Sequence, residues 1–252
     1  MTARRIIPCL DIREGKVVKG INFKGIKELG DPLVYAKKYY NQGASELVIL
    51  DITATNEGRG FTLDAVRNIA NSTPIPLTVG GGISSIQDID NVLSAGADRV
   101  GISSAAVRNP QFIYDASKEF GSDKIVVAID AKRSGDGRFY VATNGGRIIT
   151  DIDVIDWAKK MQEAGAGEIL LTSMNADGTK EGYDIELLNA ACDAINIPVI
   201  ASGGCGELSH FYDVFDRTPA AAALAASLFH YDELTVREVI DFLKSKGINV
   251  KR

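Results

Sequence analysis

Two aspartates occupy corresponding places in two similar stretches of the chain, and together they could carry out acid–base chemistry. Asp11 ends the apolar run that begins at Ile6, and Asp130 ends the apolar run that begins at Ile125, 119 residues further on. Two carboxyl groups can share the work of proton transfer when one is protonated and the other ionised. An aspartate at a strand end also commonly caps a turn. Two at equivalent positions, each before a long connection, favour a catalytic pair.

Glycine-rich turns form a second repeat. The segment Ile75–Gly82 corresponds to Ile197–Gly204, 122 residues away. Glycine lets backbone amides approach an anion closely, so we expect each turn to help hold one phosphate of a ligand that carries two. The residues expected to contact this ligand are Gly81, Gly82, Ser103 and Ser104 in the first half and Thr172, Asp177, Gly178, Gly203, Gly204, Ala226 and Ser227 in the second.

Two further polar residues could join this site. Asp51 ends the apolar run of Leu47–Asp51 and is a candidate third carboxylate. Lys19 lies in the long connection after Asp11 and could fold over a bound anion, although an exposed loop lysine would look the same.

Short β-branched runs alternate with amphipathic segments, and these elements must position the candidate residues. The expected strands are 5–10, 47–51, 76–80, 98–103, 125–130, 168–173, 198–202 and 221–227, and the expected helices are 31–42, 61–71, 85–95, 109–120, 151–164, 184–195, 207–217 and 235–246. Eight strand–helix pairs in 252 residues predict an α/β protein, a (β/α)8 TIM barrel with a two-fold internal half-barrel repeat. We expect one domain, 1–252, with half-barrels of about 1–121 and 122–252. A doubly wound open sheet is the alternative.

Long connections follow the first and fifth expected strands, at residues 12–30 and 131–150. Each contains a hairpin-like segment, Glu14–Val18 in one and Asp136–Val141 in the other. Loops at the carboxyl ends of barrel strands lie over the active site, so these two are expected there.

Charged residues stand at the amino ends of four expected strands, opposite the ends that carry the candidate active site. Buried charges of this kind are costly unless they are paired, and the alternative is a set of surface ion pairs of little energetic value. The residues are Arg5, Glu46, Arg99 and Glu168. They predict a ring of ions that closes the lower end of the barrel, which is the end formed by the amino ends of the strands.

Composition narrows the functional class. The net charge is −5, with no isolated Lys/Arg cluster, which argues against a nucleic-acid surface. No run approaches the roughly 18 apolar residues of a membrane span, and no signal-peptide pattern precedes the first strand, so a cytoplasmic protein is expected. Three cysteines and two histidines show no ligand spacing, so neither a metal nor a cofactor is expected.

Motifs along the whole chain resemble the cyclase subunit of imidazole glycerol phosphate synthase. They are Arg5–Asp11, Val17–Gly20, Leu50–Ala54, Thr78–Ile83, Ala128–Lys132, Gly165–Leu170, Asp177–Thr179, Gly182–Asp184, Ile200–Gly204 and Leu224–Ser227. The resemblance implies a lyase of histidine biosynthesis. Ammonia from a separate glutaminase subunit would convert a phosphoribulosyl-formimino aminoimidazole carboxamide ribotide into imidazole glycerol phosphate and an aminoimidazole carboxamide ribotide.

The resemblance also implies residue roles. Asp11 and Asp130 would be the acid–base pair, and Lys19 would belong to a mobile loop over the substrate. The charged residues at the lower end would be the gate through which ammonia enters from the glutaminase, which would bind at the N-terminal face of the barrel. The family usually has Lys at Arg99 and Asn at Ser103, and a Gly-Ala-Gly where this chain has Gly204–Gly206. Arginine cannot lose its proton, which affects the expected gate.

Three other functions fit parts of this pattern. The isomerase one step earlier in the pathway shares the fold and a two-phosphate ligand, a related enzyme aminates a sugar for surface polysaccharides, and a barrel without activity could bind a glutaminase. The Cys-Leu-Asp start, the Asp177–Thr179 motif and the charged ring favour the cyclase over the isomerase, which also has paired aspartates. The presence of Asp11 argues against the sugar-aminating enzyme, and the presence of both Asp11 and Asp130 argues against a barrel without activity.

Overall fold

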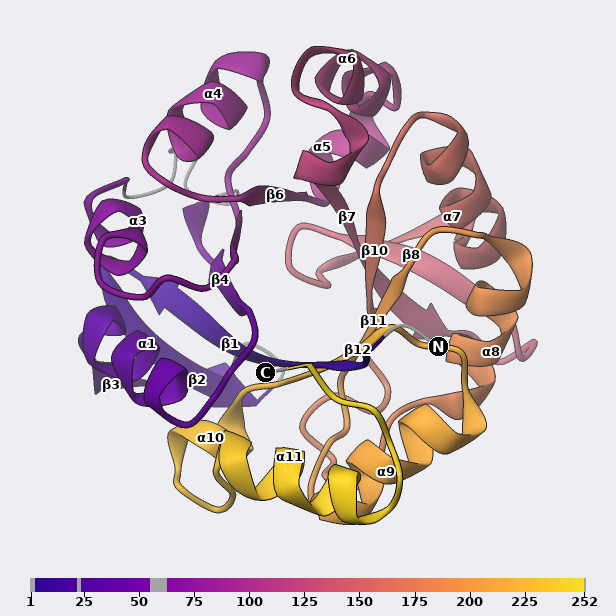
Figure 1. Ribbon diagram of the computed structural model, residues 1–252. Helices are drawn as coiled ribbons and strands as arrows, with labels where there is room; N and C mark the ends of the chain where they lie inside the picture. The colour runs from indigo at the N-terminus through magenta and orange to yellow at the C-terminus, as the bar shows by residue number, and fades with distance from the viewer. Residues whose placement is uncertain (1–2, 22–23, 55–62, 252) are drawn as a thin grey trace. The chain divides into compact units, whose positions relative to one another are not determined.

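The computed structural model describes residues 3–21, 24–54 and 63–251. The chain divides into two compact units. Unit 1 comprises Met1–Gly101 and Leu224–Arg252, and unit 2 comprises Ile102–Ala223. Figure 1 labels the strands and helices of both units.

Unit 1 is built on parallel strands that neighbour one another in chain order. They are β1 (Arg5–Arg13), β4 (Leu47–Asp51), β5 (Leu77–Gly80) and β6 (Arg99–Ile102), and β12 (Ala222–Ala225) enters from unit 2 beside β1. Its helices are α1 (Pro32–Asn41), α3 (Leu63–Ala70), α4 (Ile86–Ser94), α10 (Ser227–His230) and α11 (Val236–Ser245). The strands read as continuous apolar runs because parallel strands are covered on both faces; in β4 and β5 nearly every side chain is buried.

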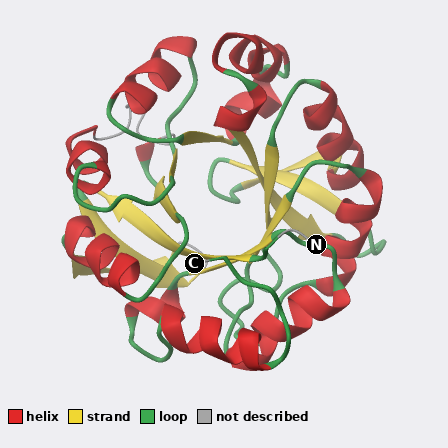
Figure 2. Cartoon of the chain, in the orientation of Figure 1, coloured by secondary structure: helices red, strands yellow, loops and turns green. Residues whose placement is uncertain are grey.

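Unit 2 repeats this plan. Its parallel strands are β7 (Ile125–Arg133), β10 (Glu168–Ser173) and β11 (Val199–Ser202), followed by the start of β12. Its helices are α5 (Ser104–Arg108), α6 (Gln111–Phe120), α7 (Val154–Glu163), α8 (Ile185–Ala194) and α9 (Leu208–Arg217), with a 3-10 turn, η1, at Ser122–Lys124. Figure 2 shows the alternation of strand and helix along the chain. In the described residues eight parallel strands each lead to a helix, which confirms the (β/α)8 class.

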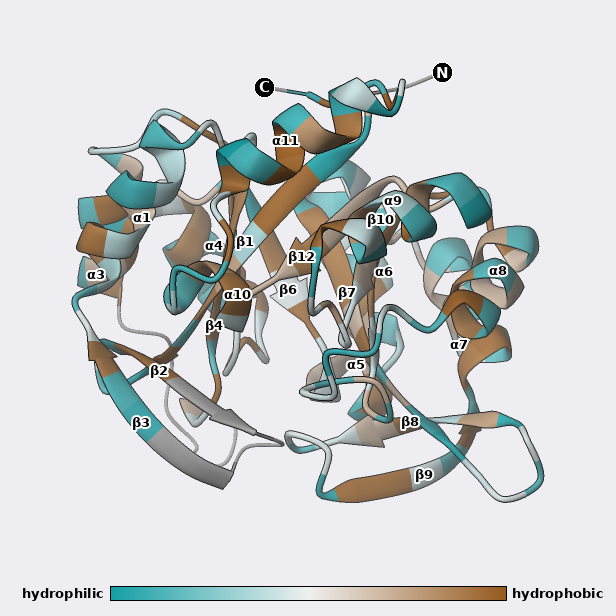
Figure 3. Ribbon diagram, turned by 90° about the horizontal axis from the view of Figure 1, so that it is seen from below, coloured by the Kyte–Doolittle hydropathy of each residue, from teal (hydrophilic) through white to brown (hydrophobic). Residues whose placement is uncertain are grey.

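Each unit also carries an antiparallel hairpin after its first long strand, as expected. In unit 1, β2 (Lys16–Ile21) pairs with β1 and with β3 (Lys24–Gly30). The turn consists of Glu14 and Gly15, both at positive φ, as a two-residue hairpin requires. In unit 2, β8 (Phe139–Thr143) pairs with β7 and with β9 (Ile148–Asp153). The apolar stretch of β9 visible in Figure 3 includes Ile148 and Ile149, both about half exposed.

Helix boundaries follow local capping chemistry. Asp31 accepts a hydrogen bond from Leu33 N at 2.8 Å and precedes a first-turn proline, and Asp153 accepts from Ile155 N at 2.8 Å. Thr235 and Glu238 form a reciprocal capping box at the start of α11. The glycines that follow five of the helices (Gly43, Gly96, Gly121, Gly165 and Gly247) all have positive φ, as the expected stops require.

Most predicted boundaries agree with the structure to within two residues, and three differ for identifiable reasons. The helix expected at 151–164 begins at Val154, because β9 continues to Asp153 through its pairing with β8. The strands expected at 5–10 and 125–130 continue to Arg13 and Arg133, because their ends pair with β2 and β8. Residues 61 and 62 of an expected helix lie outside the described residues.

The internal repeat extends to single residues. Asp31 and Asp153, the caps of α1 and α7, are 122 residues apart in the sequence, and so are Gly81 and Gly203. A side chain at Gly81 would meet Asp51 O at 2.2 Å, and one at Gly203 would meet Ser173 O at 2.7 Å. Residues 51 and 173 are again 122 apart. Both units therefore have a glycine at the same place, where the backbone packs against the last carbonyl of the neighbouring parallel strand, β4 in unit 1 and β10 in unit 2.

Candidate active site

Asp11 lies near the carboxyl end of β1 in unit 1. Its carboxyl is partly exposed, and Oδ1 lies 3.8 Å from the Sγ of Cys9, which donates to it from two residues earlier on the same strand. Its register partner on β4 is Leu50. Asp11 therefore lies at the carboxyl end of the parallel strands, next to the residues of β1 that pair with β2.

Asp130 lies at the equivalent place on β7 in unit 2. Burial, and after it the negative charge of Asp177, raises the pKa of this carboxyl to about 6. Asp130 is in register with Thr172 of β10 and Ala142 of β8. The structure thus brings two of the expected residues of unit 2, Thr172 and Asp177, beside a carboxyl that changes its protonation near neutral pH.

Asp51 has a structural task at the end of β4. Its Oδ1 accepts from Thr53 N at 3.1 Å, from Ala54 N at 3.0 Å and from Thr53 Oγ1 at 3.3 Å. This is the arrangement of a side chain that caps a turn. One oxygen of Asp51 is therefore committed to the backbone.

The glycine turn of unit 1 follows β5. Gly81 and Gly82 have φ of +100° and +72°, and the backbone of Gly81 packs so closely on Asp51 that a side chain has no room. Such left-handed backbone is open to glycine at little cost. Gly81 and Gly82 are both partly exposed at the end of the strand.

The glycine turn of unit 2 follows β11 and is tied to the loop after β10. Gly182 N donates to Gly204 O at 2.8 Å, and a side chain at Gly204 would meet Gly182 O at 2.0 Å. Asp177 N donates to Ser173 O at 2.9 Å at the other end of this loop. The close packing therefore holds Asp177 and Gly178 beside the turn of Gly203 and Gly204.

The serines expected at the phosphate sites lie at the starts of two short helices. Ser103 precedes α5 and Ser104 is its first residue; Ala226 precedes α10 and Ser227 is its first residue. Ser104 is buried, and its Oγ accepts from Asn144 N at 3.0 Å, so it also anchors the turn between β8 and β9. Ser103, Ala226 and Ser227 are partly exposed.

Lys19 is on β2, where it is in register with Lys27 of β3. Its side chain lies outside the described part of the structure. The backbone position agrees with a hairpin after β1.

Three of the four charged residues expected at the lower end form one cluster in unit 1. The Glu46 carboxylate is 1% exposed, with Oε2 2.7 Å from Arg5 Nη1 and Oε1 2.9 Å from Arg99 Nη1. Thr78 Oγ1 also donates to Oε1, at 3.3 Å. Sequence reasoning missed Thr78, although its place in β5 beside β4 was a usable signal. The fourth residue, Glu168, starts β10 in unit 2 and is buried.

Cys205, where the chain departs from the family pattern, is partly buried after the second glycine turn. Burial raises the pKa of its thiol to about 12, so the group stays protonated at neutral pH. Among the described residues, no group of His, Cys, Asp or Glu side chains is arranged to hold a metal ion. None of the helices in the described part of the chain combines the length and apolar character that crossing a bilayer needs.

The fold and these strand-end residues define an α/β protein of the (β/α)8 class with acidic groups and glycine turns at the carboxyl ends of its strands. The family described as "Histidine biosynthesis protein" matches residues 5–235, so the chain belongs to that family. Two relatives, from Clostridium botulinum (strain Langeland / NCTC 10281 / Type F) and Bacillus cereus (strain Q1), are each 54% identical, over 252 and 251 residues, with both chains covered completely. Each is named "Imidazole glycerol phosphate synthase subunit HisF". The resemblance seen in the sequence motifs is confirmed.

Proposed function

We propose that the chain is a lyase that makes imidazole glycerol phosphate and an aminoimidazole carboxamide ribotide. Its substrates would be the phosphoribulosyl-formimino aminoimidazole carboxamide ribotide and ammonia. Ring closure and cleavage of the carbon–nitrogen bond both require protons to move, and Asp11 and Asp130 supply the acid and the base. The relatives' shared name and their full-length identity support this assignment.

Asp130 is the observation that carries the proposal. A carboxyl whose pKa lies at about 6 can give up or take a proton near neutral pH, which an ordinary exposed aspartate does poorly. It stands at the carboxyl end of a parallel strand, where enzymes of this fold class keep their catalytic groups. Thr172 and Asp177 flank it and are assigned to the substrate.

The two phosphates of the substrate are assigned to the glycine turns and the short helices. Gly81, Gly82, Ser103 and Ser104 bind one phosphate, and Gly178, Gly203, Gly204, Ala226 and Ser227 bind the other. Lys19 closes over the substrate from the β2–β3 hairpin, and Asp51 keeps the turn after β4 in place. The two sequence repeats, at about 1–121 and 122–252, are proposed to be the half-barrels, each of which supplies one of the two aspartates.

Ammonia is proposed to come from a glutaminase subunit that binds at the N-terminal face of the barrel. Arg5, Glu46 and Arg99 lie at the amino ends of β1, β4 and β6, and with Glu168 at the start of β10 they form the gate. A glutaminase partner fits the word "subunit" in the relatives' name. We propose that the complex works in the cytoplasm.

The test is turnover of the formimino ribotide by the purified chain in ammonium buffer at alkaline pH, followed by the loss of substrate absorbance. Wild type should be active without a partner, and Asp11→Asn and Asp130→Asn should each lower the rate by about 10²–10⁴-fold. Asp136→Asn, at the exposed tip of the second hairpin, is the matched control and should be as active as wild type. Both Asn variants retaining more than about a tenth of the rate would overturn the acid–base assignment. A wild type that isomerises the substrate of the preceding step in the pathway, but does not cyclise the formimino ribotide, would overturn the proposed reaction.

A further inference from the structure

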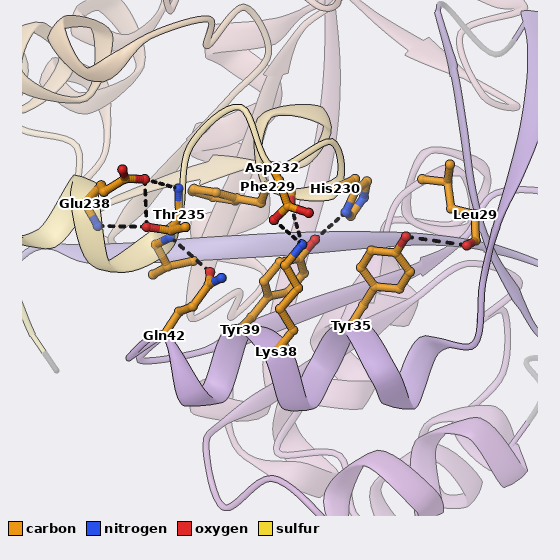
Figure 4. Close-up of polar contacts among 11 residues, drawn as sticks. Leu29, Tyr35, Lys38, Tyr39, Gln42, Phe229, His230, Asp232, Thr235 and Glu238 are labelled. Carbon is orange, nitrogen blue, oxygen red and sulfur yellow. Dashed lines mark hydrogen bonds and ion pairs between the residues drawn. The ribbon is translucent and has the colours of Figure 1, made fainter.

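A polar cluster in unit 1 joins helix α1 to the turn that follows β12, and the proposed chemistry does not use it. Figure 4 shows its side chains reaching across from α1. The hydroxyl of Tyr39 lies 2.5 Å from His230 Nδ1; Tyr39 has no exposed surface and His230 is 5% exposed. Burial raises the pKa of Tyr39 strongly, so the phenol keeps its proton and is hydrogen-bonded to the imidazole.

Lys38, the neighbouring residue on α1, makes two further contacts to the same turn. Its ammonium donates to Phe229 O at 3.2 Å and forms an ion pair with Asp232 Oδ1 at 2.6 Å. Two consecutive helix residues thus bind three residues of the segment between β12 and α11. The ring of Tyr39 also packs against Phe229, with centroids 6.1 Å apart.

The segment held in this way contains α10, a helix of four residues. Within it, Phe229 N and His230 N both donate to Ala226 O, at 3.1 and 3.0 Å, and Tyr231 N donates to Ser227 O at 3.0 Å. A single helical turn is not stable alone, because nucleation fixes several residues for each bond gained. The contacts from α1 therefore set where α10 sits, and with it Ala226 and Ser227.

The buried pair of Tyr39 and His230 is polar, although packing alone does not require polar side chains there. Apolar residues could fill the space of a buried Tyr–His pair without the cost of desolvating polar atoms. A hydrogen bond adds directional constraint, because its energy falls steeply with distance and angle. Packing alone would secure stability, whereas this bond fixes the orientation of the turn.

We propose that Tyr39 and Lys38 are positioning residues that hold the Ala226–Ser227 turn in the geometry that binds a substrate phosphate. The inference rests on the proposed function, which assigns that turn to one of the two phosphates. Tyr39 and Lys38 act through the backbone of α10 and do not touch the substrate themselves.

The test compares Tyr39→Phe and Lys38→Met with wild type. Tyr40→Phe and Lys37→Met, the exposed neighbours on the same helix, are the matched controls. Binding of inorganic phosphate is titrated by phosphorus NMR, and KM and kcat are measured for the formimino ribotide in ammonium buffer. We expect Tyr39→Phe and Lys38→Met to bind phosphate more weakly and to raise KM by about tenfold, equivalent to about 1.4 kcal/mol. Their kcat should be nearly unchanged. Lys38→Arg should restore most of the affinity, because it keeps a donor and a positive charge.

The outcomes separate positioning from stability and from the proposed reaction. A lower melting temperature with unchanged phosphate affinity and KM would overturn the proposal, since it would leave these residues a structural role alone. Should Tyr39→Phe fail to fold, Lys38→Met decides, because that side chain is 26% exposed and its loss is mild. Weaker phosphate binding in Tyr39→Phe and Lys38→Met, together with a wild type that does not cyclise, would support the positioning role while refuting the reaction. Phosphate affinity that is the same in the wild type and in all the variants would refute the positioning role whatever the reaction.

Discussion

Arg99 and Glu46 form an ion pair at the amino ends of β6 and β4, with Arg99 Nη1 2.9 Å from Glu46 Oε1. Arg5 binds the other carboxylate oxygen, so two guanidinium groups share one buried acid. A buried carboxylate needs such partners, because desolvation is otherwise costly. Glu46 is therefore held between two cationic partners.

Arg99→Met should remove one of the two ion pairs and lower the free energy of unfolding by roughly 1–3 kcal/mol. It should also lower glutamine-dependent turnover in the complex more than ammonia-dependent turnover of the chain alone, because the proposed gate would lose a member. Urea denaturation and the two assays measure these effects. Arg67→Met removes an exposed ion pair with Asp64 and is the control, with an expected change below about 0.5 kcal/mol. Equal effects from the two variants would contradict a special role for the cluster.

Asp130→Asn should stabilise the protein at neutral and alkaline pH. The folded-state pKa is about 6 against an ordinary value of 3.8, so between about pH 4 and 6 the folded state binds a proton that the unfolded state does not. Stability of the wild type therefore falls as pH rises through this window and stays lower above it. Removing the charge should recover up to roughly 2–3 kcal/mol at pH 8.

Urea denaturation of both proteins from pH 4 to pH 8 measures this effect. The difference in unfolding free energy should shrink as pH falls and vanish near pH 4, where the wild-type carboxyl is protonated in the folded state. A difference that does not change with pH would contradict a raised pKa. Active sites commonly trade stability for function in this way.

The positions of strands and helices could be predicted because local chemistry determines them. Asp31 with Pro32 marks a helix start, and Glu14 with Gly15 marks a hairpin turn, without any knowledge of distant residues. The start of α7 could not be predicted in this way. Residues 151–153 read as a helix start, and only the pairing of Tyr140 with Asp153 keeps them in a strand. Helices α5 and α10 have five and four residues, too few to show a helical apolar period.

The candidate site was predictable by residue type but not by partner. Glu46, Arg5 and Arg99 were all expected at strand starts, but their convergence on one carboxylate depends on the register between strands. The effect of Asp177 on Asp130 depends on a loop that folds back through the bond from Gly182 N to Gly204 O. The link from Tyr39 to His230 joins residues 191 positions apart, and no local pattern indicates it.

Asp177→Asn should lower the pKa of Asp130, because the neighbouring negative charge raises it in the wild type. The limb of the pH–rate profile that reports Asp130 should therefore move to lower pH, whichever role Asp130 has in the reaction. Asp136→Asn makes the same change in net charge at an exposed hairpin tip and is the control. The profile of kcat/KM between pH 5 and pH 9 measures the shift. An unmoved limb in Asp177→Asn, or an equal shift in both variants, would show that Asp177 does not act on Asp130.

Gly204→Ala should disrupt the second glycine turn far more than Gly137→Ala disrupts the hairpin. Both glycines have positive φ, +99° and +85°, so both substitutions carry a similar left-handed strain of about 1–2 kcal/mol. A side chain at Gly137 meets nothing within 4 Å, whereas one at Gly204 would lie 2.0 Å from Gly182 O. The difference in unfolding free energy between the two variants therefore isolates the cost of separating the turn from the Asp177–Gly182 loop. Thermal denaturation together with phosphate titration measures it. If the two variants melt together, the loop yields easily, and close packing at Gly204 is not what holds Asp177 and Gly178 in place.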